Sequence, residues 1–290
     1  MTDLGALGGY GGSVAYGIND LGQIVGTASI TYGQHAFLYS GGQMTDLDTL
    51  GSPDSTARSI NAKGQITGEC SMRAGDQKAF LYENGAMRDL DSLISGMSSA
   101  GRVIDAFGRV YGYTNDSSGD VHMAYFDNGG WTLINPEVHP GTDVVGVNSH
   151  GDILANYDGG SPNQHGIVVS NGAITHLGVL NIALGGSNVD AINDLGQIVG
   201  SSPLQDGSRR AVLYENSVPI DLNSLIPSGS GWTLEYATSI NDQGQIVGIG
   251  TSPDSIDRAF LLTPVPEPMT LSVMALGGFW FLLRKPSLLK

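Results

Sequence analysis

Recurring short turns carry the residue types that could do chemistry. Four of them read GINDLGQIVG from Gly17, SINAKGQITG from Ser59, AINDLGQIVG from Ala191 and SINDQGQIVG from Ser239. The side-chain oxygens of neighbouring Asn and Asp residues could also be ligands of a calcium ion. A calcium loop, however, needs several oxygen ligands spaced two residues apart and usually a bidentate acid, and NDLGQ has neither feature. Asn and Asp also bond their own backbone in tight turns, and glycine supplies positive φ. We therefore predict hairpin turns with no metal ligand.

A second candidate site precedes each turn. Small residues such as Ala15 and Gly17 flank one position that varies from copy to copy. The variable residues are Tyr16, Arg58, Arg102, Val145, Asp190 and Thr238. Small residues suit a crowded inner strand, so the side chains between them could meet a ligand near an axis. The candidate ligand ring is Tyr16, Arg58, Arg102 and Asp190, and ordinary packing between repeats is the alternative.

The sequence contains no recognisable catalytic constellation. There is no G-x-S-x-G elbow, no H-E-x-x-H, no phosphate loop and no paired metal-ligand spacing. The six histidines are scattered, and we expect surface or strand-end positions for them. Cys70 is the single cysteine, which excludes an intramolecular disulfide and is predicted to be a buried small hydrophobe. We predict no catalytic residue, no cofactor and no metal.

The turns belong to a repeat that runs along the chain. Weaker copies are VIDAFGRVYG from Val103 and GVNSHGDILA from Gly146. The turn glycines follow one another at intervals of 42, 44, 43, 45 and 48 residues; they are Gly22, Gly64, Gly108, Gly151, Gly196 and Gly244. An apolar run such as AFLY at Ala36 comes about fifteen residues after the glycine, followed by a D-L segment such as MTDL from Met44. Four strand-sized pieces per period of 40–45 residues are typical of a propeller blade.

The two ends of the repeat region complement each other. The sixth copy has no D-L segment after Ala259–Leu262, whereas Met1–Leu4 reads MTDL, identical to Met44–Leu47. Three strands from one end and one from the other would close a ring and remove open sheet edges. We predict an all-β, six-bladed β-propeller of about 43-residue repeats over residues 1–263, closed by the N-terminal strand. An open β-solenoid is the competing architecture, but it gives Met1–Leu4 no role.

The repeats resemble the HAF repeat family of extracellular bacterial proteins, through His35, Ala36 and Phe37. The resemblance covers Met1 to about Thr263 and is weaker in the third and fourth copies, where Asp105 replaces Asn and Ala155 replaces glycine. It implies an exported repeat protein and brings no established activity.

The composition changes after Thr263. Residues 264–268 form a proline-rich linker, and Met269–Leu283 is fifteen residues without a charge. At about 1.5 Å per residue this gives roughly 22 Å of helix, somewhat short of a bilayer core of about 30 Å. We predict that residues 269–290 form a short transmembrane helix with a basic end, anchored by Arg284 and Lys285 on the cytoplasmic side.

The order of Pro-Glu-Pro, apolar stretch and basic cluster resembles the PEP-CTERM sorting signal. The resemblance implies that Pro266, Glu267 and Pro268 are a motif recognised by an exosortase, which processes the protein at the membrane. Export requires an N-terminal signal, and MTDLGALGGYGG has neither a basic region nor an apolar core. A natural start upstream of Met1, with its signal removed or missed, is the alternative that export raises; further repeats there would weaken the argument for closure by six blades.

Composition narrows the choice of function. The net charge of −15 opposes binding to nucleic acid, and charged residues make up only 14% of the chain. We predict an exported, membrane-associated or cell-surface protein with a non-enzymatic role in adhesion, matrix assembly or ligand binding. Its expected partners are the membrane, an exosortase and, as a candidate, extracellular polysaccharide. The alternatives are a polysaccharide-active hydrolase or lyase on a propeller and a calcium-dependent binding module.

Overall fold

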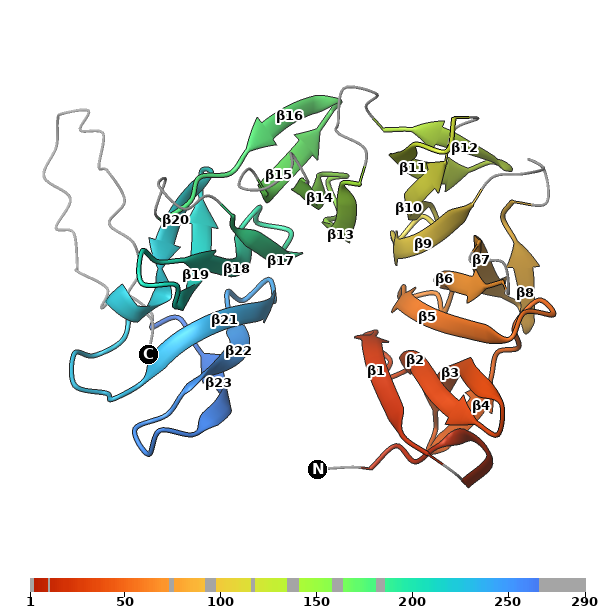
Figure 1. Ribbon diagram of the computed structural model, residues 1–290, viewed down its shortest axis with the longest axis horizontal. Coiled ribbons are helices and arrows are strands. Elements are labelled where there is room, and N and C mark those ends of the chain that lie inside the picture. Colours follow the sequence, from red (N-terminus) through yellow and green to blue (C-terminus); the bar gives the residue numbers. More distant parts are fainter. Residues whose placement is uncertain are drawn as a thin grey trace, which may run out of the picture. The chain divides into compact units, whose positions relative to one another are not determined.

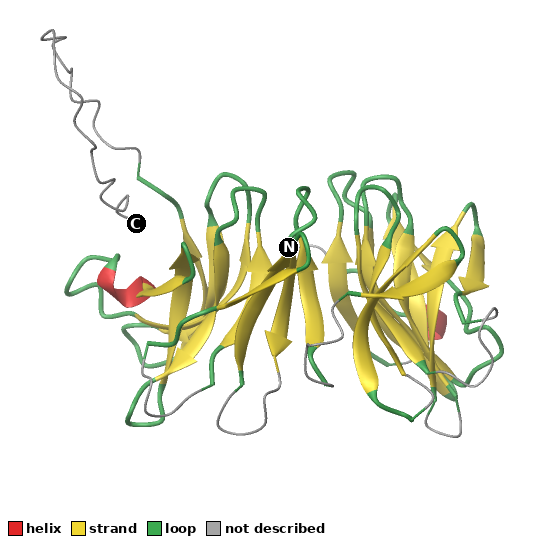
Figure 2. Ribbon diagram, turned by 90° about the horizontal axis from the view of Figure 1, so that it is seen from above, coloured by secondary structure: helices red, strands yellow, loops and turns green. Residues whose placement is uncertain are grey.

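The protein is built almost entirely of short antiparallel strands. The computed structural model describes residues 3–9, 11–72, 76–91, 98–115, 118–134, 141–157, 164–180 and 186–265. The only helical elements in these ranges are two 3-10 turns, η1 (Leu7–Gly9) and η2 (Leu222–Ser224) (Figure 2). The chain divides into two compact units, Met1–His176 and Leu177–Lys290.

The first unit holds four sheets, one for each of the first four sequence repeats (Figure 1). Each has four strands in chain order, paired antiparallel. Their bounds are β1 (Ser13–Ile18), β2 (Ile24–Ile30), β3 (Gly33–Ser40), β4 (Gln43–Asp46); β5 (Asp54–Ile60), β6 (Ile66–Ser71), β7 (Gln77–Glu83), β8 (Ala86–Asp89); β9 (Ser99–Ile104), β10 (Val110–Asn115), β11 (Val121–Asp127), β12 (Gly130–Leu133); β13 (Asp143–Val147), β14 (Ile153–Tyr157), β15 (His165–Ser170) and β16 (Ala173–His176).

The second unit holds two sheets. The fifth is four-stranded and the sixth has three strands within the described residues. Their strands are β17 (Asn188–Ile192), β18 (Ile198–Pro203), β19 (Arg209–Glu215), β20 (Val218–Asp221); β21 (Thr233–Ile240), β22 (Ile246–Thr251) and β23 (Asp257–Leu262). Within the described residues the repeat therefore predicts the order of strands in each sheet correctly, with three strands in the sixth sheet.

The N-D-x-G-Q segments are hairpin turns, as predicted. Asn19 Oδ1 accepts hydrogen bonds from the backbone N–H groups of Leu21 and Gln23 at 3.1 and 3.0 Å. Asn19 Nδ2 donates to Gln23 Oε1 at 2.8 Å and to the carbonyl oxygen of Asn61, in the next sheet, at 3.0 Å. All six turn glycines have positive φ, from 72° at Gly22 to 96° at Gly108. The motif thus closes its own hairpin and ties neighbouring sheets together.

The first strand of every sheet contains a β-bulge at the variable sequence position. Between β1 and β2, for example, Ala15 pairs with Gly26 but Gly17 pairs with Val25, which leaves Tyr16 as the extra residue. The same shift isolates Arg58, Arg102, Val145, Asp190 and Thr238 in the other five sheets. A bulge re-aims a side chain and interrupts regular pairing.

A glycine on the second strand makes room for the bulge. A Cβ atom on Gly68 would lie 1.9 Å from the carbonyl oxygen of Thr56 on β5, and one on Gly26 would lie 1.9 Å from that of Val14 on β1. No side chain can occupy such a position without moving the backbone. Glycine is therefore needed where the first strand comes this close, as at Gly26 and Gly68, whereas the fourth sheet has Ala155 at the same place.

The core lies between successive sheets of each unit. Val25, Ala36 and Leu47 of the first sheet pack against Ile66 and Phe80 of the second. Equivalent clusters join the second sheet to the third, the third to the fourth, and the fifth to the sixth. Each blade-sized sheet is too thin to bury its apolar faces alone, so stacking stabilises the repeats collectively.

Several predictions concern segments that the structure does not describe. The sorting motif Pro266, Glu267 and Pro268 and the membrane segment 269–290 with Arg284 and Lys285 lie outside the described residues. Along the described ranges, no helix has the length and apolar character needed to cross a bilayer. Asp3 and Leu4 are described and lie in no strand, so closure by Met1–Leu4 stays a prediction.

Candidate functional site

The bulges of the first unit present a linked set of charged and aromatic side chains. Arg58, from the bulge of β5, lies over the ring of Tyr16, from the bulge of β1, with its guanidinium carbon 4.9 Å from the ring centroid. Its Nε and Nη2 atoms donate to one oxygen, Oε1, of Glu69 at 2.9 and 2.6 Å. Burial lowers the pKa of Arg58, but the hydrogen bond and charge of Glu69 outweigh it and raise the pKa above its usual value. Arg58 is therefore a fixed, permanently charged donor.

Arg102 extends this set into the third and fourth sheets. Its Nη1 lies 3.6 Å from Glu69 Oε1, and its Nε donates to Asp143 Oδ1 at 3.2 Å. Its guanidinium carbon lies 5.3 Å from the centroid of the Tyr113 ring. Tyr113 in turn donates its hydroxyl to Gln77 Oε1, and burial raises the pKa of that hydroxyl although Arg102 lowers it. We name Tyr16, Arg58, Glu69, Arg102, Tyr113 and Asp143 the inner-strand cluster.

Glu69 is the centre of the inner-strand cluster. Its side chain is only 4% exposed, whereas the side chains of Arg58 and Arg102 are 31% and 23% exposed. Glu69 Oε2 is buried and accepts no hydrogen bond among the described residues. The two guanidinium groups thus reach solvent while the carboxylate between them is covered. With Asp143 included, two positive and two negative charges balance in the cluster.

The second unit carries a smaller set of the same kind. Its bulge residue Asp190 interacts electrostatically with Arg209, which donates from Nη1 to Ser201 Oγ at 2.9 Å and lies with its guanidinium carbon 6.0 Å from the centroid of the Tyr236 ring. Desolvation by the surrounding protein raises the pKa of Asp190 to about 6, although Arg209 lowers it. In both units an acid, an arginine and a tyrosine therefore lie near one another at a bulge residue.

The predicted ligand ring is brought together in part. Tyr16, Arg58 and Arg102 join the inner-strand cluster, whereas Asp190 lies in the second unit beside Arg209. Sequence reasoning missed Glu69, Tyr113, Asp143, Ser201, Arg209 and Tyr236. Glu69, Tyr113 and Ser201 follow the last glycine of the second strand, a position that also varies along the repeats: Thr27, Glu69, Tyr113, Asn156, Ser201 and Ile249. That second variable position was the available signal.

Two histidines that look scattered in the sequence are paired by the fold. His165 Nε2 lies 2.6 Å from His176 Nδ1, where β15 and β16 bring the two rings together beside Tyr157. In the first sheet the corresponding pair is His35 and Asp46, at 2.7 Å. Burial, and then the neighbouring His165, lower the pKa of His176. The fourth sheet thus has two histidines where the first sheet has a histidine beside a carboxylate.

Other candidate reactive groups have structural roles. Cys70 is fully buried, which confirms its assignment as a core residue, and burial raises the pKa of its thiol to about 12. The turn oxygens that calcium would need already accept hydrogen bonds; Asn193 Oδ1, for example, accepts from Leu195 and Gln197. Within the described ranges, no group of three or more His, Cys, Asp or Glu side chains is placed to hold a metal ion.

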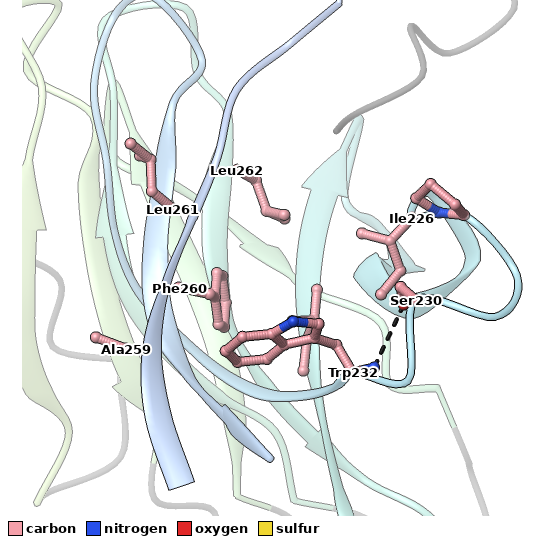
Figure 3. Close-up of a pocket in the computed structure, with 9 residues that line it drawn as sticks. Ile226, Ser230, Trp232, Ala259, Phe260, Leu261 and Leu262 are labelled. Atoms are coloured by element: carbon pink, nitrogen blue, oxygen red, sulfur yellow. Dashed lines mark hydrogen bonds between the residues drawn. The ribbon is translucent and has the colours of Figure 1, made fainter. Parts of the chain in front are cut away.

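An apolar pocket of about 330 Å³ lies beside β23, on the side where the described residues provide no neighbouring strand (Figure 3). Trp232, Leu234 and Phe260 line it, and Trp232 donates its backbone N–H to Ser230 Oγ at 3.3 Å. In the first sheet this place is taken by the D-L leucine: Leu47 is buried and donates its N–H to the carbonyl of Ala36 at 2.9 Å. Ala259, which also lines the pocket, corresponds to Ala36. The pocket therefore corresponds to the space of a D-L leucine that β23 lacks.

No protein-family model matches the chain, and no curated protein matches its sequence. Among solved structures it is similar to TolB from Acinetobacter baumannii, with a TM-score of 0.55 and 14% identity over 83% of this chain and 64% of that chain. It is also similar to the β-propeller domain of the Trilobed protease from Pyrococcus furiosus, with a TM-score of 0.57 and 10% identity over 86% and 78% of the two chains.

A third similar structure is a prolyl endopeptidase, with a TM-score of 0.54 and 10% identity over 88% of this chain and 40% of that chain. The chain thus spans less than two thirds of the lengths of TolB and the endopeptidase. At sequence identities this low, structural similarity indicates a shared fold and gives no information about activity. Together with the six antiparallel sheets, it establishes an all-β, propeller-like fold for this protein.

Proposed function

We propose that this protein is a non-enzymatic binding protein, exported and sorted to the membrane, whose ligand lies against the bulge residues of the inner strands. One observation carries the binding role. In all six sheets the residue that the bulge expels from regular pairing is the one that the repeat leaves variable. A repeated scaffold that varies its re-aimed side chains is suited to recognition.

The character of the inner-strand cluster supports binding over packing alone. Packing between sheets uses apolar clusters in both units, whereas the bulges of the second and third sheets carry Arg58 and Arg102 with partly exposed guanidinium groups. Charged side chains held in ion pairs but open to solvent on one side are typical of a site that orients a polar ligand. Glu69 is engaged by both arginines, so this carboxylate already has partners within the protein.

A thermal-shift panel tests the binding role. The full chain is titrated with neutral oligosaccharides, carboxylated oligosaccharides, inorganic phosphate, spermidine and calcium, since a bound ligand raises the melting temperature. We expect at least one class to stabilise the protein, and the double variant Arg58→Ala, Arg102→Ala to lose that response. The matched control is Arg258→Ala, which removes an exposed arginine paired with Asp254. A response to none of the classes, or one that survives the double variant, contradicts the proposal.

The proposal extends to a closed ring of six blades, in which Met1–Leu4 pairs beside β23. Two exposed apolar side chains support it. Val247 is 42% exposed, whereas Val25, Thr67, Tyr111, Leu154 and Val199, at the same place in the other sheets, are buried. Ile18 is 67% exposed, whereas its counterparts Ile60 and Ile104 are buried. In the first unit, Val25, Ile60 and Ile104 are buried in apolar clusters between neighbouring sheets. Val147 and Ile192, the counterparts of Ile18 in the fourth and fifth sheets, are half-buried. A closed ring would cover Ile18 and Val247 in the same way.

Substitution of these two residues tests ring closure. If the ring is closed, Ile18→Ser and Val247→Ser should each lower the free energy of unfolding by about 1–3 kcal/mol through loss of buried apolar surface. If both side chains stay in water, the change should remain within about 0.5 kcal/mol. Ile256→Ser is the control, because Ile256 is exposed in the loop before β23. Equal, small effects at all three positions would rule out closure.

Membrane sorting is proposed from the sequence of the tail. Met269–Leu283 has no charge and is followed by Arg284 and Lys285, and Pro266, Glu267 and Pro268 precede it as the exosortase motif. Fifteen uncharged residues rich in Leu, Phe and Met favour a bilayer over water. With an export signal added, the full chain should fractionate with membranes, and a chain ending at Thr263 should be soluble with nearly the same melting temperature. A loss of several degrees on truncation would place the tail within the fold.

A further inference from the structure

We infer that the inner-strand cluster takes an uncharged polyhydroxylated ligand, a neutral saccharide, and that Glu69 is a specificity-determining residue that excludes carboxylated saccharides. The inference rests on the proposed binding function and names its ligand class. Its starting point is the arrangement of Arg58 and Arg102 around the single covered carboxylate of Glu69.

The arginines still have hydrogen-bonding capacity for a ligand. Arg58 uses Nε and Nη2 on Glu69, and Arg102 uses Nε on Asp143. A guanidinium group has five N–H donors, so each arginine retains donors on its exposed side. These donors require acceptor atoms from the ligand, and the hydroxyl and ring oxygens of a saccharide supply them.

The charge of the cluster decides against an anionic ligand. Glu69 lies within 3.6 Å of both guanidinium groups, and Asp143 is paired with Arg102. A ligand carboxylate placed on the arginines would therefore meet two acids already in place. The whole chain adds to this repulsion with a net charge of −15. Repulsion of this kind is a common source of specificity, because it lowers the affinity for a charged ligand more than the affinity for a neutral one.

Two further features fit a sugar. Tyr16 is 47% exposed beneath Arg58 and offers an aromatic face to the C–H surface of a pyranose ring. Glu69 Oε2 is a buried acceptor with no hydrogen bond among the described residues. Arg102 contacts the other oxygen of this carboxylate, Oε1, at 3.6 Å, so a ligand hydroxyl that donates to Oε2 would not replace that contact. A ligand that has only acceptor atoms cannot donate to Oε2.

Matched saccharides test the inference on the full chain. The probes are hexamers of glucose, galactose and mannose and their counterparts oxidised to carboxylates at C6, measured by isothermal titration calorimetry. We expect at least one neutral hexamer to bind, and its carboxylated counterpart to bind at least about tenfold more weakly. In Glu69→Gln the guanidinium charge is uncovered at constant side-chain size, so the preference should shift toward the carboxylated probe by about tenfold or more.

A second variant keeps the test decisive if Glu69→Gln does not fold. Asp143→Asn removes the outer acid, which is half exposed, and should shift the preference in the same direction by a smaller factor. Tighter binding of a carboxylated hexamer by the unaltered protein overturns the inference and leaves the binding function in place. So does binding of phosphate or spermidine with no response to any hexamer. Failure of every probe, including the full thermal-shift panel, removes both. An unchanged preference in both acid variants overturns the role of Glu69.

Discussion

The side-chain amide of Asn61 donates a hydrogen bond of 2.9 Å to the backbone carbonyl oxygen of Asp105, 44 residues later and in the next sheet. The same amide nitrogen donates to Gln65 Oε1 at 2.8 Å. Asn19 and Asn193 make equivalent bonds to the turns that follow them, those of Asn61 and Asn241. The turn motif is therefore also a ladder between sheets, which explains why an amide rather than a carboxylate recurs there.

This ladder predicts a large effect of Asn61→Asp. The aspartate has no N–H to donate, so both bonds from Nδ2 are lost at a buried position. We expect the free energy of unfolding to fall by about 1–3 kcal/mol in urea denaturation. Asn241→Asp is the matched control, because Asn241 is exposed and the described residues give its Nδ2 only the bond to Gln245. An equal loss at the two positions would contradict the role of the ladder.

The third repeat shows what a natural acid at this place requires. Asp105 accepts a hydrogen bond from Arg109 Nε at 2.9 Å and one from the Tyr111 hydroxyl at 3.3 Å. Neither partner recurs in the other N-D-x-G-Q copies, where glutamine follows the glycine. The change from Asn to Asp in this repeat is therefore accompanied by a basic residue, Arg109, that pairs with the acid. Asp105 has no side-chain N–H group, so it cannot donate a hydrogen bond to the next turn.

The close approach at Gly68 predicts a second destabilising change. In Gly68→Ala the new Cβ would lie 1.9 Å from the carbonyl oxygen of Thr56, so the bulged strand that carries Arg58 must move. We expect a loss of at least about 2 kcal/mol and a lower melting temperature. Gly130→Ala is the control, since a Cβ there has no atom within 4 Å. A wild-type melting temperature for Gly68→Ala would mean that the bulge adapts without strain.

The sequence predicts the repeated parts of this fold far better than its site. Turn glycines, apolar runs and D-L segments recur at fixed phase, because each solves the same backbone problem in every sheet. The inner-strand cluster depends on differences between the repeats. Arg58 and Glu69 form an ion pair because two variable positions on adjacent strands of one sheet carry opposite charges. An alignment of the repeats identifies the positions that they share and gives no information on pairs of variable positions. Arg102 joins them from another sheet, which no local pattern indicates.

The pairing of His165 with His176 predicts a pH-dependent weakness in the fourth sheet. The pKa of His176 is lowered from 6.5 by burial and by His165. The unfolded chain therefore takes up this proton more readily than the native protein, and stability should fall as the pH drops below about 6.5. His176→Asp restores the arrangement of His35 and Asp46 and should reduce that fall.

The measurement is the difference in melting temperature between His176→Asp and the unaltered protein at pH 7 and pH 5. We expect the difference to favour the variant more at pH 5. His150→Asp makes the same chemical change at an exposed turn of the fourth sheet and serves as the control. A difference that does not depend on pH, or one shared by the control, would show that the histidine pair does not cause the weakness.

The bulge residue of the fifth sheet predicts pH dependence of the opposite sign. The pKa of Asp190 is raised from 3.8 to about 6 by desolvation, only partly offset by Arg209. Between these values the native protein holds a proton that the unfolded chain has lost, so ionisation costs stability as the pH rises from about 4 to about 6. Above pH 6 the cost remains constant. A carboxylate kept at this cost on the inner strand is expected at a position retained for binding rather than for stability.

Asp190→Asn removes the ionisable group at nearly constant size. The variant should gain stability relative to the unaltered protein across pH 4 to 6, measured by urea denaturation at several pH values, and keep that gain at pH 7. Asp206→Asn is a control of opposite sign: the hydroxyl and backbone N–H of Ser208 lower the pKa of exposed Asp206, so its carboxylate stabilises the protein at neutral pH. A loss of stability in Asp190→Asn at pH 7 would mean that Arg209 compensates the charge fully. In that event Asp190 belongs to the fold as an ion pair, and its place in the ligand ring would need support from binding data alone.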